Sequence, residues 1–214
     1  MTRKFALYMT CLAVLVGMHF SAVASAEIVV GVKPGDWIEY NVAFTGDIIE
    51  QHDVTWARIE VLAVEGKTID IKITSIFSDG REETETLTLN LETGQIGDAF
   101  IIPANLDTGD PFKEQYEGNI TISGVEEKTY MGAKRKVVYA TTSQTTFYWD
   151  QSTGFLVEAT SFYTDFTMMT NAEKTNMWQT QAFELNPIVF IVLIVLVIVV
   201  VLALVIFLIR KMKK

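Results

Sequence analysis

Aromatic side chains on predicted strands are the most numerous candidates for binding chemistry in this chain. They occur in β-rich runs, at Trp37, Tyr40, Trp56, Phe147, Trp149, Phe155, Phe162 and Phe166. Such rings either fill the core of a sheet domain or, in an open barrel, line a cavity for an apolar ligand. Alternation along a strand puts Phe147 and Trp149 on one face and Tyr148 on the other, so these three rings cannot all serve one purpose.

A loop rich in carboxylate and amide groups is the candidate metal site. Asn105, Asp107 and Asp110 offer the oxygen ligands that calcium prefers, and Glu114 or Glu117 follows downstream. The match to a calcium-binding loop is poor, because the glycine falls at the fifth position rather than the sixth. Asp and Gly are also ordinary loop residues, so a plain turn remains the alternative.

Catalytic groups are scarce. His52 is the one histidine left once the predicted signal peptide is removed, and Cys11 lies inside that peptide. A histidine-dependent triad, a thiolate nucleophile and a zinc site therefore lack the side chains they need. Carboxylates are plentiful, but those at 82–85 and 126–127 are typical of solvated turns or strand edges. We expect no enzymatic activity and no cofactor, and we keep an envelope hydrolase as the last alternative.

The first 26 residues predict a cleaved export signal. Arg3 and Lys4 precede an apolar stretch from Phe5 to Val16, and Ala24-Ser25-Ala26 is a small-residue cleavage site. The apolar stretch is too short to span a bilayer comfortably. An uncleaved N-terminal anchor is the alternative, and Thr10 before Cys11 argues against lipidation.

The C-terminus predicts one transmembrane helix at residues 188–209. This stretch has no charged or polar side chain, and about 20 apolar residues cross a bilayer core of roughly 30 Å. The basic tail at 210–214 should stay cytoplasmic, which places the domain outside the cell. The topology therefore depends on one group of side chains: Arg210, Lys211, Lys213 and Lys214. Removal of the span by processing is the alternative.

These ends leave one domain. The predicted boundaries are a domain at 27–179 and a juxtamembrane linker at 180–187. From Glu27 to Asn186 the chain has 26 acidic and 11 basic residues, a formal charge of −15. Such a surface repels nucleic acid and anionic lipid, and it suits a solvated extracellular domain, cation binding or a basic partner.

The domain carries a single glycosylation sequon, Asn119-Ile120-Thr121, which makes Asn119 a candidate acceptor. It contains no cysteine, so it has no disulfide framework. Animal domains exported in this way often carry disulfides. The composition therefore favours a prokaryotic source.

Hydrophobic alternation predicts a mainly β fold. Residues 69–73 and 86–91 alternate apolar and polar side chains, as half-buried antiparallel strands do. Further β-rich runs cover residues 37–45, 54–64, 134–142, 145–150, 155–160 and 162–170. Turn pairs separate the runs, at Glu65-Gly66, Asp79-Gly80, Thr93-Gly94 and Thr153-Gly154. We predict an antiparallel meander forming a curved sheet, open barrel or sandwich, with 103–117 as a loop.

Two short motifs carry a family resemblance. The run from Val32 to Tyr40 contains Gly-Asp-Trp, and the run from Tyr148 to Glu158 has the form Tyr-Trp-Asp-x-x-Thr-Gly-x-Leu. Both resemble segments of archaeal exported, membrane-anchored proteins of unknown function. The hairpin is also similar, more weakly, to that of lipoprotein-carrier half-barrels, which implies an acyl-chain cavity.

The sequence thus favours a non-enzymatic, membrane-anchored surface domain for partner binding or envelope structure. It would lie in the plasma membrane, with its N-terminal domain extracellular. A carrier or sensor of a lipid-like ligand in an open β-barrel is the main alternative. A filled interior favours partner binding, whereas a cavity of several hundred Å³ lined by the aromatic side chains would favour the carrier.

Overall fold

The computed structural model describes residues 27–46, 54–178 and 195–196. The predicted signal peptide, His52, the linker at 180–187 and the basic tail lie outside these residues. The predicted span at 188–209 also lies outside them, apart from Val195 and Leu196. Within the described part of the chain, no helix has the length and apolar character needed to cross a membrane.

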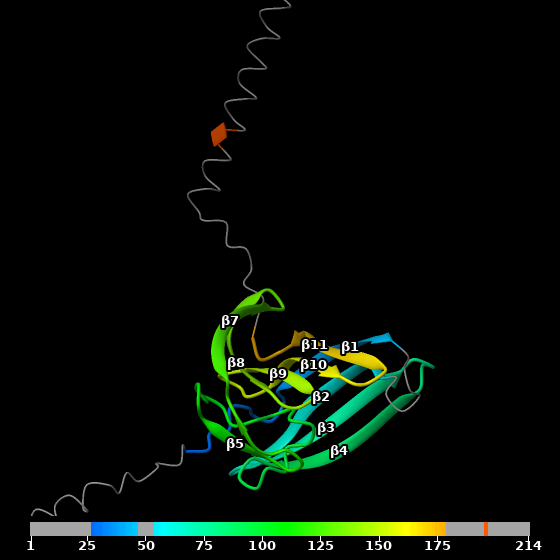
Figure 1. Ribbon diagram of the computed structural model, residues 1–214. Coiled ribbons are helices and arrows are strands. Elements are labelled where there is room, and N and C mark those ends of the chain that lie inside the picture. The colour runs from blue at the N-terminus through cyan, green and yellow to red at the C-terminus, as the bar shows by residue number, and fades with distance from the viewer. Residues whose placement is uncertain (1–26, 47–53, 179–194, 197–214) are drawn as a thin grey trace, which may run out of the picture.

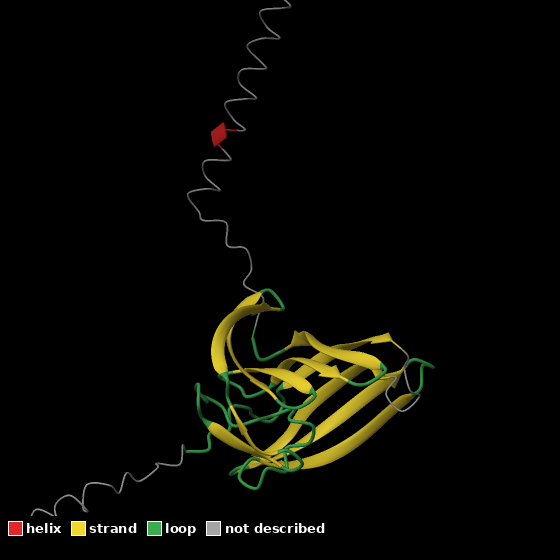
Figure 2. Ribbon diagram, in the orientation of Figure 1, coloured by secondary structure: helices red, strands yellow, loops and turns green. Residues whose placement is uncertain are grey.

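The described domain is built from antiparallel strands (Figures 1 and 2). Nine strands form one sheet in the order β4-β3-β2-β1-β11-β10-β9-β8-β7. In chain order they are β1 (Trp37–Gly46), β2 (Val54–Glu65), β3 (Thr68–Phe77), β4 (Glu82–Asn90), β7 (Gly124–Tyr130), β8 (Ala133–Thr141), β9 (Thr145–Asp150), β10 (Leu156–Phe162) and β11 (Phe166–Thr175). A separate two-stranded sheet pairs β5 (Pro111–Glu114) with β6 (Gly118–Thr121).

The strand order brings the first and last strands together in the middle of the sheet. β1 pairs with β11 from Ile38 opposite Thr175 to Gly46 opposite Phe166. Two meanders, β1 to β4 and β7 to β11, run outward from this seam. Their outer strands, β4 and β7, are the two edges, and the sheet is not closed. The predicted antiparallel meander is thereby confirmed.

Between the two meanders, residues 91–123 form a cover segment that packs on one face of the sheet. The indole Nε1 of Trp149 donates a hydrogen bond of 2.6 Å to the Ala99 carbonyl. The amide of Leu156 donates to the carbonyl of Phe100. The ring of Phe112 meets that of Trp149 edge-on, with centroids 5.4 Å apart. We call this covered side the inner face of the sheet.

The core lies between the inner face and the cover segment. Alternation buries Ile38 and Tyr40 on β1, while their strand neighbours are more exposed. The cover segment adds Ile96, Ile101 and Ile102, all fully buried. The chain therefore supplies its own filling for this part of the sheet.

Most predicted strands match observed ones, but β6 and β7 were not predicted, and the predicted run at 162–170 crosses the turn between β10 and β11. Three further differences lie between β4 and β5. β4 begins at Glu82, four residues before the predicted run at 86–91, because acidic and threonine side chains at 82–85 hid the alternation. Thr93-Gly94 does turn the chain, but it closes only an isolated bridge between Asn90 and Gln95 and does not separate two strands, so the prediction was wrong there. The predicted loop at 103–117 was wrong in part, because it contains β5, whose pairing with β6 is visible only in three dimensions.

Candidate functional site

An open groove of about 860 Å³ lies where the cover segment meets the β2–β3 turn and the first described residues. Its floor is apolar and its rim carries charges of both signs. The apolar lining consists of Ile28, Leu91, Pro103, Leu106, Pro111 and Phe112, and the polar lining of Glu27, Lys67, Glu92, Gly109, Asp110, Lys113 and Asn119.

Backbone contacts hold the groove walls in place. The amide of Leu91 donates to the carbonyl of Lys67, which fixes the start of the cover segment on the β2–β3 turn. The β5–β6 hairpin forms another wall, with Phe112 opposite Ile120 and both side chains buried. Lys113 and Asn119 are likewise opposite each other and exposed. The hairpin thus presents a polar edge above an apolar base.

An ion pair holds two of the charged side chains on the rim in place. The ammonium of Lys67 lies 2.7 Å from a carboxylate oxygen of Glu92. This hydrogen bond and the positive charge of Lys67 lower the pKa of Glu92, and the charge of Lys113 adds to the effect. Glu92 therefore stays ionised at neutral pH and serves as a fixed charge rather than as a proton donor.

One carboxyl group that the sequence did not single out has a raised pKa. Burial is the main cause at Asp98, and the negative charge of Glu114 adds to it. Glu114 itself is buried and accepts hydrogen bonds from the amides of Tyr116 and Glu117, both at 2.6 Å. Neither carboxyl group lines the groove. Asp98 and Glu114 influence each other only because the fold brings them close, so no local sequence pattern could reveal the raised pKa of Asp98.

The aromatic candidates do not share one cavity. Tyr40, Trp149, Phe155 and Phe166 are buried in the core. Phe147 stacks on Trp149 with centroids 5.1 Å apart, so these two rings do lie on one face.

The remaining aromatic candidates lie elsewhere. The guanidinium of Arg58 lies 4.2 Å from the ring centroid of Trp37. Trp56 is half-buried, and Phe162 is 58% exposed. No ring of these three lines the groove.

The candidate metal residues form a hydrogen-bonded loop. A carboxylate oxygen of Asp110 accepts from the amide of Asp107 at 2.7 Å, and Asp107 accepts from the amide of Thr108 at 2.8 Å. Asn105 has a positive φ of 61°. These contacts give the side chains a role in shaping the turn. In the described residues, no group of three or more His, Cys, Asp or Glu side chains is arranged to hold a metal ion.

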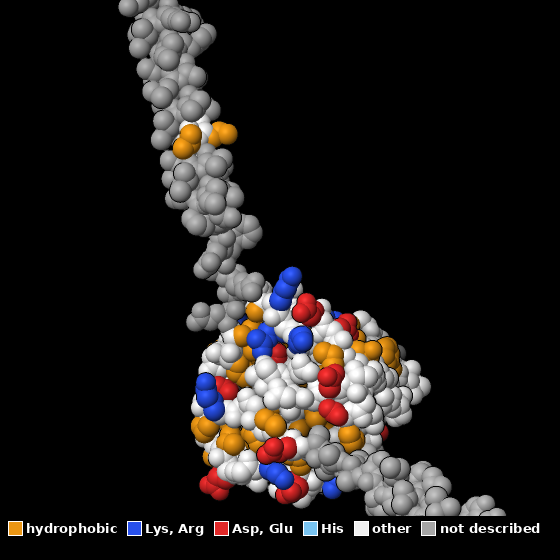
Figure 3. All heavy atoms as spheres, turned by 90° about the vertical axis from the view of Figure 1, so that its left-hand side faces the viewer, with side chains coloured by type: hydrophobic (Ala, Val, Ile, Leu, Met, Phe, Trp, Pro, Cys, Tyr) orange, Lys and Arg blue, Asp and Glu red, His pale blue; other side chains and the backbone are white. Residues whose placement is uncertain are grey.

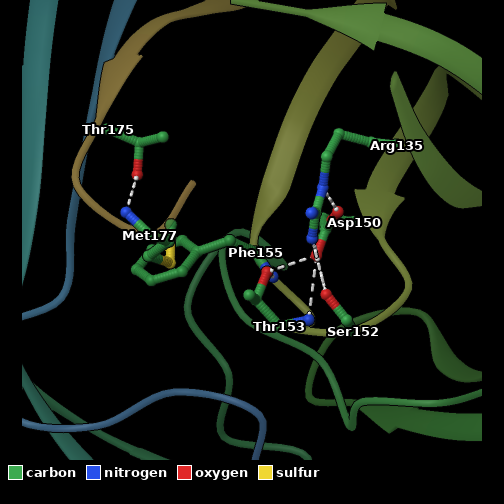
Figure 4. Close-up of polar contacts among 7 residues, drawn as sticks. All are labelled: Arg135, Asp150, Ser152, Thr153, Phe155, Thr175 and Met177. Atoms are coloured by element: carbon green, nitrogen blue, oxygen red, sulfur yellow. Dashed lines mark hydrogen bonds and ion pairs between the residues drawn. The ribbon is translucent and has the colours of Figure 1, made fainter. Parts of the chain in front are cut away.

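A second polar cluster surrounds Asp150 in the β9–β10 turn (Figure 4). Its carboxylate accepts from the Nε and a terminal nitrogen of Arg135, at 2.7 and 3.0 Å. It also accepts from the hydroxyls of Ser152 and Thr153 and from the Thr153 amide. In the Asp-x-x-Thr-Gly part of the hairpin motif, the aspartate carboxylate therefore accepts hydrogen bonds from the turn residues that follow it.

Comparisons with known proteins add little. No family model and no curated protein matches the chain. Among solved structures, it is similar to one described as "The Siderocalin Ex-FABP functions through dual ligand specificities", with 11% identity over 74% of this chain and 80% of that chain. The TM-score is 0.25, too low to carry an argument about fold or ligand.

Proposed function

We propose that this chain is an exported, membrane-anchored, non-enzymatic surface protein whose groove binds a protein partner outside the cell. The groove carries the proposal, because it joins an apolar floor to a rim of fixed charges. Protein interfaces commonly combine an apolar centre with a polar rim. Glu92 is held ionised by Lys67, so it offers a partner protein a negative charge.

The membrane anchor is proposed from the sequence. The apolar run at 188–209, the basic residues after it and the export signal agree on one orientation. The two motifs that resemble archaeal exported proteins fit the same placement. We also propose that the nine-stranded sheet, which is open between its edge strands β4 and β7, is an open barrel.

Extraction experiments test the anchor. The full chain should stay in the membrane pellet after alkaline carbonate washing, and a chain lacking residues 188–214 should be released. Release of the full chain by carbonate would contradict the anchor.

Site-specific photo-crosslinking in cells of the native host tests the groove. A photoreactive residue at Lys113, on the groove rim, should form an adduct with one protein. The control position is Tyr116, in the loop of the same β5–β6 hairpin. It is 82% exposed and does not line the groove. The purified partner should then bind the full chain in detergent, and Glu92→Lys should weaken binding. Equal adducts from both positions, or binding unaffected by Glu92→Lys, would contradict the groove.

A carrier of a lipid-like ligand is the second candidate, on one observation. Towards the β3–β4 turn the inner face has half-buried apolar side chains, including Phe44 and Met168, which lie opposite each other. Such a surface can take an acyl chain, whereas the other end is filled by the cover segment. Native mass spectrometry of the full chain from its own membrane should reveal a bound apolar mass. A clean polypeptide mass would contradict the carrier.

A further inference from the structure

Positive charge is concentrated in one hairpin of an acidic domain. Residues 124–136, which form β7, the turn and the start of β8, contain four of the 11 basic residues between Glu27 and Asn186 and only two acids. The hairpin is therefore formally +2, while the rest of that stretch is −17. In Figure 3 several Lys and Arg side chains gather near the upper edge of the face on the side of β5, β7 and β8.

The two faces of the hairpin differ. Ala133 and Val137 are buried, and Arg135 on the same face is engaged with Asp150. Lys134 and Lys136 alternate with them and are exposed. Neither lysine forms an ion pair with a described residue.

The strand opposite these lysines adds one acid to the exposed face. Lys134 lies opposite Thr129, and Lys136 lies opposite Glu127. Glu127 reduces the local positive charge without forming an ion pair with Lys136. The ammonium groups of Lys134 and Lys136 therefore remain available to a ligand.

The hairpin lies beside the point where the chain leaves the domain. The guanidinium of Arg135 is 4.6 Å from the ring centroid of Trp178, the last residue described in the domain. Just before it, Asn176 accepts from the amide of Trp37 at 2.9 Å and donates to the Gly35 carbonyl at 2.8 Å. In Figure 1 the β7–β8 hairpin curls towards the end of β11.

Chain length limits how far this end can lie from a membrane. Residues 179–187 separate Trp178 from the predicted span at 188–209. Nine residues reach at most about 32 Å when fully extended. The hairpin therefore lies within roughly that distance of the start of the span, which lets it reach the head groups.

We propose that the exposed face of the β7–β8 hairpin, with Lys134 and Lys136, docks onto the anionic lipid head groups of the membrane that anchors the chain. The inference rests on the proposed anchor. Each lysine near an anionic surface favours the docked state about fivefold. The rest of the stretch from Glu27 to Asn186, at −17, is repelled by the same surface. Docking therefore also decides which side of the domain faces away from the membrane.

The test uses the full chain in lipid nanodiscs, with Cys11→Ser and Thr129→Cys to place one donor dye on the hairpin and acceptor dyes on lipid head groups. Energy transfer should rise when phosphatidylcholine is mixed with about a quarter of phosphatidylglycerol. It should fall again in about 1 M salt, where charge interactions are screened beyond about 3 Å.

Charge reversal supplies the matched comparison. Lys134→Glu should lower the ratio of docked to undocked chains in anionic nanodiscs by fivefold or more. Arg81→Glu, with the same change of charge on the exposed β3–β4 turn, should change it less than twofold. Circular dichroism should show that both variants fold.

The outcomes separate the two proposals. A chain that does not insert even into neutral nanodiscs would overturn the anchor, and the docking with it. A chain that inserts, but gives the same transfer in neutral and anionic lipid, would overturn the docking alone. Equal effects of the two charge reversals would also overturn it, because the response would then reflect net charge.

Discussion

The guanidinium of Arg135 makes two hydrogen bonds to the carboxylate of Asp150, whose side chain is only 1% exposed. The pair joins β8 to the end of β9, 15 residues apart in sequence. Three further donors from Ser152 and Thr153 complete the shell around the carboxylate. A buried charge with this many partners stabilises the turn, and becomes costly once a partner is removed.

Replacing Arg135 should therefore be strongly destabilising. In Arg135→Ala the carboxylate of Asp150 stays buried and loses its cation, which costs about 3 kcal/mol, the low end for a buried pair, because Arg135 remains partly exposed. Chemical denaturation of the purified chain gives the value. The exposed pair Lys67–Glu92 provides the comparison, and Lys67→Ala should leave the unfolding midpoint unchanged. Equal effects of the two substitutions would contradict the role of burial.

The same carboxylate should make stability depend on acid. Burial by itself raises the pKa of Asp150. Hydrogen bonds from Arg135, Ser152 and Thr153, together with the positive charge of Arg135, outweigh burial and lower the pKa from 3.8. A lowered folded-state pKa contributes stability above the unfolded value, and that contribution is lost as the pH falls from about 5 through the folded pKa. In Asp150→Asn, the free energy of unfolding should fall less steeply with pH between about pH 5 and 2 than in the native chain. An unchanged slope would show that other carboxyl groups govern acid stability.

Local patterns revealed the strands because alternation and turn chemistry act over a few residues. The run at 145–150 matches β9 at both ends, and the stacking of Phe147 on Trp149 follows from period-two alternation. β1 and β2 were also predicted to within one residue. In each of these segments one face is mainly apolar.

The cover segment and the groove were not predictable in the same way. Ile101 and Ile102 are buried where the cover segment meets β10 and the turn before it: Ile101 forms a bridge with Phe155, and the amide of Ile102 donates to the Gly154 carbonyl. The groove arises where three distant segments meet, at Ile28, Lys67 and Phe112. Residues 91–123 have no sustained alternation, so only the strand order places them over the inner face.

A glycine in the β9–β10 turn should resist substitution. Gly154 has a positive φ of 74°, and a Cβ there would clash with the carbonyl of Ile102. Gly154→Ala should cost several kcal/mol, since about 1 to 2 kcal/mol of backbone strain adds to displacement of the cover segment. Gly109 is the matched position, because its φ is also positive but a Cβ would meet nothing within 4 Å. Thermal unfolding should show a clearly smaller loss for Gly109→Ala, and equal losses would mean that strain alone decides.

The hydroxyl of Tyr40 should contribute to stability through one buried hydrogen bond. It donates to the carbonyl of Leu156 at 2.8 Å, and thereby links β1 to β10 inside the core. Tyr40→Phe leaves that carbonyl without this donor, at a cost of about 1 to 2 kcal/mol. Denaturant unfolding should show this loss, whereas Tyr116→Phe, at an exposed position, should have no effect. Equal stability of Tyr40→Phe and the native chain would contradict the hydrogen bond.

Tyr130 should titrate later than an exposed tyrosine. Burial is the main cause of its raised pKa, followed by its hydrogen bond of 2.7 Å to Glu158 and the negative charge of that carboxylate. The unfolded chain releases this proton near pH 10. The contribution of Tyr130 to the free energy of unfolding is therefore fully present below about pH 9 and is lost as the pH rises further. Ultraviolet titration should show that Tyr130→Phe removes a late-ionising group, and that Glu158→Gln makes this group ionise earlier. If Glu158→Gln leaves the titration curve unchanged, the carboxylate has no part in holding the proton on Tyr130.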